Sequence, residues 1–173
     1  MLNVSPLKII PAAGEERSTP GLGPEETVAE LSLHKAAEVA EKCAPEDVII
    51  AADTIVWFGN EILGKPKDHD DAVRMLSALS GSEHTVYTGV TVLRGAETYT
   101  EVEASKVRFR ELSAREIEAY IATGEPMDKA GAYGAQGLAA VFVEGITGDF
   151  FNVMGLPLCR LGKMLAKLGV ELI

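Results

Sequence analysis

The chain has 173 residues, of which 47% are hydrophobic, and its formal net charge is −10. This length suits a single domain over residues 1–173 with a sizeable core, and the acidic balance excludes nucleic acid as an expected partner, because a duplex-binding surface needs a basic face. Apolar runs too short to cross a bilayer and a start without signal-peptide features predict a cytoplasmic protein with no membrane partner, in which Cys43 and Cys159 stay reduced.

The predicted elements alternate between strands and helices, which indicates an α/β fold with a mixed sheet. The expected strands are residues 7–10, 48–52 continuing at 55–57, 61–63, 84–93, 98–109, 139–143 and 150–153. The expected helices are residues 24–43, 69–79, 113–123 and 157–169. Local signals support these boundaries: Asp68 is a candidate N-cap, Gly95-Ala96 a hairpin turn, and Ser113 with Glu116 a capping box.

The strand around residues 48–57 is unusual because Asp53 and Thr54 interrupt a run of β-branched and small apolar residues. A carboxylate in such a place loses several kcal/mol of solvation unless a cation or hydrogen-bond donors compensate. Asp53 is therefore either an acid paired with a lysine or capping a turn, or a metal-binding carboxylate or general base. The sequence alone leaves these alternatives open.

Two glycine-containing segments have features of ligand-binding loops. Residues 59–66 match a P-loop except for the last position, where Pro66 offers neither a hydroxyl nor an N–H group to a phosphate. Residues 128–137 contain three glycines that permit close backbone approach to a ligand, and Gln136 offers both a donor and an acceptor. This segment is either a ligand-binding loop or a tight structural turn.

Taken together, several strings in this order resemble the Maf family of nucleoside triphosphate pyrophosphatases over essentially the whole chain. The strings are Ala51-Ala52-Asp53-Thr54, Leu63-Gly64-Lys65-Pro66, residues 75–81 (MLSALSG), 84–90 (HTVYTGV), 125–137 (EPMDKAGAYGAQG), 148–150 (GDF) and 153–158 (VMGLPL). The Ala-Asp-Thr triplet and the Tyr-Gly-x-Gln-Gly loop resemble the branch that acts on dTTP and UTP.

The resemblance implies an elongated Maf/ITPase-like fold with a substrate cleft between two lobes, and a homodimer. It implies hydrolysis of dTTP and UTP to the monophosphate and pyrophosphate with Mg²⁺ or Mn²⁺. At the matching positions, Asp53 would activate water, Glu16 and Asp53 would hold the metal, Lys35 and Lys65 would face the phosphates, and Thr54 and Gln136 would help to select the base.

One departure from the family pattern concerns the N-terminus. The family opens with a strand and a phosphate loop of the form Ser-x-Ser-Pro-Arg-Arg, for which Val4-Ser5-Pro6-Leu7-Lys8 has no arginines. We therefore expect this segment to be missing, with weaker phosphate binding, lower activity and a partly uncovered sheet edge. The alternative function is a weakly active or inactive nucleotide-binding protein that regulates cell division, such as septum formation.

Overall fold

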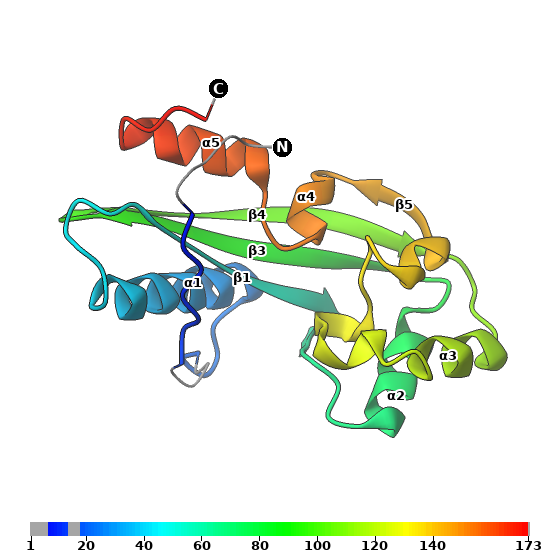
Figure 1. Ribbon diagram of the computed structural model, residues 1–173. Coiled ribbons are helices and arrows are strands. Elements are labelled where there is room, and N and C mark those ends of the chain that lie inside the picture. The colour runs from blue at the N-terminus through cyan, green and yellow to red at the C-terminus, as the bar shows by residue number, and fades with distance from the viewer. Residues whose placement is uncertain (1–6, 14–17, 173) are drawn as a thin grey trace.

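A five-stranded sheet forms the centre of the structure, a computed structural model that describes residues 7–13 and 18–172 (Figure 1). The strands, in the sheet order β2-β1-β3-β4-β5, are β1 (Ile49–Phe58), β2 (Glu61–Leu63), β3 (Glu83–Arg94), β4 (Glu97–Phe109) and β5 (Val143–Thr147). The helices are α1 (Pro24–Ala40), α2 (His69–Leu79), α3 (Ala114–Ile121), α4 (Phe150–Val153) and α5 (Leu158–Lys167). Three short 3₁₀ turns cover Glu125–Asp128, Ala130–Ala132 and Leu138–Phe142.

The expected α/β class is confirmed, but the sheet is antiparallel in every described pair rather than mixed. Two hairpins account for part of this difference. Gly59 and Asn60 both have positive φ angles between β1 and β2, as a two-residue hairpin turn requires, and Gly95 turns β3 into β4. Neighbours joined in this way reverse direction without the long crossover that a parallel pair needs.

Three predicted strands are wrong. Residues 7–10 are irregular, and Leu7 and Ile9 are 69% and 87% exposed, so this apolar run has no sheet to cover. The predicted strand at 139–143 is mostly a 3₁₀ turn that leads into β5, and the one at 150–153 is α4. Asp149 begins α4, because its side chain accepts a hydrogen bond from the Phe151 N–H group.

The helices cover both faces of the sheet and divide its core into two clusters (Figure 1). α1 packs on β1 and β3, and α5 lies on the opposite face, over Val90 and Val92 of β3. α2, α3 and the 3₁₀ turns form the larger cluster around Phe109 at the other end of the sheet. None of the helices within the described residues is both long and apolar enough to span a bilayer.

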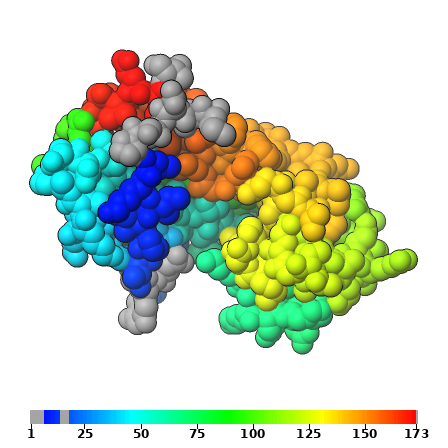
Figure 2. Space-filling model, in the orientation of Figure 1, coloured from blue at the N-terminus to red at the C-terminus, as the bar shows by residue number. Residues whose placement is uncertain are grey.

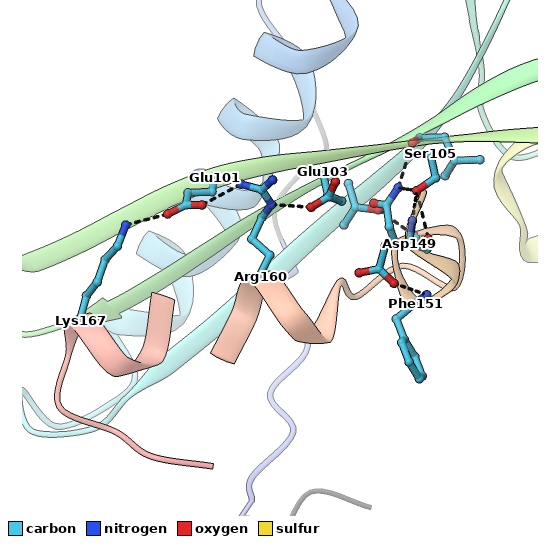
Figure 3. A network of polar contacts seen from close by, with 10 residues as sticks. Glu101, Glu103, Ser105, Asp149, Phe151, Arg160 and Lys167 are labelled. Atoms are coloured by element: carbon cyan, nitrogen blue, oxygen red, sulfur yellow. Dashed lines mark hydrogen bonds and ion pairs between the residues drawn. The ribbon is translucent and has the colours of Figure 1, made fainter. Parts of the chain in front are cut away.

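Ion pairs fix α5 to the sheet (Figure 3). The Arg160 guanidinium donates to Glu103 and Glu101 of β4 at 2.7 and 2.8 Å, and Lys167 donates to the second oxygen of Glu101 at 2.7 Å. Hydrogen bonds from Lys167 and Arg160 hold the pKa of Glu101 below its usual value. The network therefore ties α5 to β4, a strand that α4 also contacts.

His84 makes the larger cluster sensitive to acid. Its side chain is 2% exposed, its Nε2 atom lies 2.8 Å from the Tyr133 hydroxyl, and burial lowers its pKa to about 4. In the unfolded chain the histidine pKa is about 6.5, so the unfolded state takes up the proton at a higher pH than the folded state does. The free energy of unfolding should therefore fall as the pH drops from about 6.5 to 4, by up to about 3 kcal/mol. Urea unfolding across this pH range should show a smaller loss of stability for His84→Gln than for the unmodified protein. An equal loss in both would mean that His84 is not the source of the acid sensitivity.

Candidate active site

A pocket of about 300 Å³ brings together five residues that were predicted from the sequence. They are Lys35, Asp53, Thr54, Lys65 and Gln136. Figure 2 shows the surface hollowed between residues 7–13 and the segment near residues 120–135, with β1 at the bottom of the hollow. The remaining predicted residue, Glu16, lies outside the described residues.

The pocket follows the outer edge of β1. β1 pairs with β2 only at Val56–Phe58, and no described strand pairs with this edge over residues 49–55. β1 runs without interruption through Asp53 and Thr54, which pair with Gly89 and Thr88 of β3. Because side chains alternate along a strand, Asp53 faces α1 and Thr54 faces α4, so the pocket has two chemically different halves.

The half beside α1 contains an ion pair. Lys35 Nζ lies 2.5 Å from Asp53 Oδ1, and the Asp53 side chain is 8% exposed. A carboxylate with so little water around it requires such a cation to stay ionised. Asp53 is therefore paired with a lysine, as the structural alternative expected. It also faces a pocket wide enough for a ligand, which the functional alternative requires.

The pairing depends on the close approach of α1 to the sheet at Gly89. A Cβ atom built on Gly89 would lie only 2.1 Å from the backbone oxygen of Val28 in α1. Lys35 follows Val28 by seven residues, or about two helical turns, so both lie on the same face of α1. The absence of a side chain at Gly89 thus lets α1 approach closely enough for Lys35 to reach Asp53.

The glycine-rich loop that carries Gln136 is held from behind by two side chains. The Tyr120 hydroxyl donates to Glu125 at 2.9 Å and accepts from the Gly134 N–H group, while the Glu125 carboxylate accepts from the Leu138 N–H group. A Cβ atom on Gly137 would lie 2.2 Å from Glu125 Oε1. The glycines therefore allow tight packing behind the loop, and Gln136 remains exposed at the pocket.

The structure adds lining residues that the sequence did not single out. Lys129 and Asp128 line the pocket and lie 2.5 Å apart, and this hydrogen bond lowers the pKa of Asp128. Met154 and Gly155 line it from the end of α4. Lys129 is the third lysine at the pocket, after Lys35 and Lys65. Its position inside the glycine-rich segment was the sequence feature that could have identified it.

These features define an α/β protein with a pocket lined by three lysines, one buried carboxylate and an apolar wall. The sequence model described as "Maf-like protein" matches residues 1–168. The chain belongs to the Maf family.

Curated relatives agree with this assignment. A protein of Clostridium botulinum (strain Kyoto / Type A2) named dTTP/UTP pyrophosphatase is 50% identical over 149 residues, which cover 84% of this chain and 77% of the relative. Proteins with the same name from Aquifex aeolicus and Clostridium perfringens are 47% and 46% identical, over 94% and 86% of this chain and 85% and 79% of theirs. The suspected family resemblance is thus confirmed.

Proposed function

We propose that this protein hydrolyses UTP and dTTP to the monophosphate and pyrophosphate. The observation that carries the proposal is the single pocket in which a lysine-paired carboxylate, two further lysines and Gln136 converge. The relatives named dTTP/UTP pyrophosphatase support the choice of substrate and the class of enzyme, a nucleotide pyrophosphatase. The substrate would place its phosphates beside Asp53 and its base in the half of the pocket beside α4.

Asp53 would act as the general base that takes a proton from the attacking water. Its position in the strand is fixed by the pairing of β1 with β3, where Asp53 lies opposite Gly89, so its carboxylate is oriented before the substrate arrives. Lys35 and Lys65 would stabilise the negative charge that grows on the departing pyrophosphate, and Lys129 lies where it could do the same. A chain with a net charge of −10 can bind a triphosphate because these lysines reverse the field locally.

A divalent cation, Mg²⁺ or Mn²⁺, fits this donor set. Among the described residues, no three His, Cys, Asp or Glu side chains form a metal cluster. Mg²⁺ does not need one, because it binds through one or two carboxylates together with water and substrate phosphates. Asp53 would hold the ion, with Glu16 as the second proposed ligand, and the bound ion would neutralise phosphate charge and acidify water.

The base would be selected by Thr54 and Gln136, which lie on different segments of the same pocket. Val86, Val153 and Met154 supply the apolar surface on which a pyrimidine ring can lie. We further propose that the enzyme is cytoplasmic, forms a homodimer and folds as a single domain.

Pyrophosphate release from a panel of nucleotides tests the proposal. With Mg²⁺ present, the full chain should release pyrophosphate from UTP and dTTP faster than from CTP, ATP and GTP, and removal of the metal by EDTA should stop release. Binding of UTP without any release of pyrophosphate would refute the enzyme and favour the alternative, a nucleotide-binding regulatory protein.

A further inference from the structure

The Thr54 hydroxyl is the last member of a hydrogen-bond chain that begins in the interior. Thr54 Oγ1 lies 2.9 Å from Thr88 Oγ1, and the Thr88 hydroxyl donates to the backbone oxygen of Asn152 at 3.0 Å. Thr88 and Asn152 are completely buried, whereas Thr54 is partly exposed and lines the pocket. The chain therefore joins α4 to the pocket wall.

The number of protons in this chain fixes its direction. A threonine hydroxyl has one proton to donate, and a carbonyl oxygen can only accept. Since the Thr88 proton is used by Asn152, the bond between the two threonines must be donated by Thr54. The Thr54 oxygen then has only lone pairs to offer a ligand.

Asn152, whose backbone oxygen is the acceptor at the interior end of this hydrogen-bond chain, is held in place by its side chain. The Asn152 carboxamide donates to the Val86 oxygen at 3.1 Å and to Ser105 Oγ at 3.0 Å. Ser105 in turn exchanges hydrogen bonds with the backbone of Asp149, at the start of α4 (Figure 3). If Thr54 turned its proton toward the pocket, it would leave the buried Thr88 oxygen without its donor, which no water could replace.

The Thr54 hydroxyl oxygen lies in the half of the pocket beside α4, where the surroundings suit a nucleotide base. A Cβ atom built on Gly155 would lie 3.4 Å from Thr54 Oγ1, so the hydroxyl is directly beside the end of α4. Val153 and Met154 line the pocket there, and they are apolar. A flat ring with a polar edge fits these surroundings better than a phosphate does.

We infer that Thr88 is a positioning residue that holds the Thr54 hydroxyl as a hydrogen-bond acceptor, and that this acceptor selects a pyrimidine with a proton on N3. Uracil and thymine have an N3–H group, whereas N3 of cytosine carries a lone pair, which the lone pairs of the Thr54 oxygen repel. A site built to accept from a substrate N–H group discriminates against an analogue that lacks it. The inference deepens the proposed function and rests on it for the identity of the ligand.

Replacement of Thr88 by Val tests the inference at nearly constant volume. Thr88→Val frees the Thr54 proton to turn toward the pocket, so Thr54 can pair with N3 of either base. The ratio of kcat/KM for UTP to that for CTP should fall about tenfold, as expected for the loss of one hydrogen-bond preference. Asn152 keeps a partner in this variant, because its carbonyl also accepts from the Gly155 N–H group.

Two controls separate positioning from a general loss of structure. Thr88→Ser keeps the hydroxyl and should keep the UTP-to-CTP ratio of the unmodified protein. In a Thr54→Val background, Thr88→Val should not change the ratio further, because the group through which it acts is gone. A ratio unchanged by Thr88→Val, or changed equally with and without Thr54, would overturn the inference.

Equilibrium binding of the α,β-methylene analogues of UTP and CTP distinguishes this inference from the proposed function. A roughly tenfold lower binding preference in Thr88→Val supports the inference even if the unmodified protein releases no pyrophosphate, in which case only the proposed activity fails. Pyrophosphate release with an unchanged preference overturns the inference alone. Absence of binding of either analogue overturns both.

Discussion

Asp53→Asn should lower the rate of pyrophosphate release from UTP by about 10²- to 10⁴-fold, the range that a general base contributes. The amide has nearly the same shape as the carboxylate, but it cannot take a proton from water and is a poor ligand for Mg²⁺. It also removes the ion pair with Lys35, whose Nζ lies 2.5 Å away. The measurement is kcat with saturating UTP and Mg²⁺.

The control for this change is Asp70→Asn in α2, the same substitution at a side chain that is 99% exposed. It should leave kcat unchanged, and thermal unfolding of both variants should show that Asp53→Asn is still folded. Equal rates for Asp53→Asn and the unmodified protein would remove Asp53 from the mechanism. The pocket would then need another base, and Asp128 is the other carboxylate among the described residues that line it.

The sequence predicted those parts of the fold that depend on local chemistry. The Asp68 side chain accepts from the Asp71 N–H group as expected of an N-cap, and Ser113 and Glu116 form the expected capping box. The errors arose where the apolar pattern was short. Ala139 and Phe142 are buried and three residues apart, which fits a 3₁₀ turn, whereas the expected strand requires burial at every second residue.

The candidate site was predictable only in part, for a related reason. Asp53 stood out because it interrupts an apolar strand, and Gln136 because it lies among glycines. The contribution of α4 could not be predicted, because it depends on contacts between residues far apart in the chain, such as the bond from Asn152 to Ser105. Because residues 150–153 were predicted as a strand, the role of the Asn152 carbonyl in orienting Thr88 and Thr54 could not be anticipated.

Gly89→Ala should lower the free energy of unfolding by about 3 kcal/mol or more, the upper part of the range for overpacked sites. The added Cβ atom would lie 2.1 Å from the oxygen and 2.4 Å from the carbonyl carbon of Val28. Both are backbone atoms of α1, so no side chain can rotate to make room. The helix as a whole would have to move away from β1 and β3.

The displacement should also affect the site, because the helix that moves carries Lys35. We expect a lower urea midpoint and, in the fraction that remains folded, slower pyrophosphate release as Lys35 withdraws from Asp53. Gly145→Ala in β5 is the matched control: nothing lies within 4 Å of its added Cβ atom, so its stability should change by no more than about 0.5 kcal/mol. Equal urea midpoints for the two variants would mean that α1 does not approach the sheet as closely as Gly89 allows, and that the position of Lys35 has another cause.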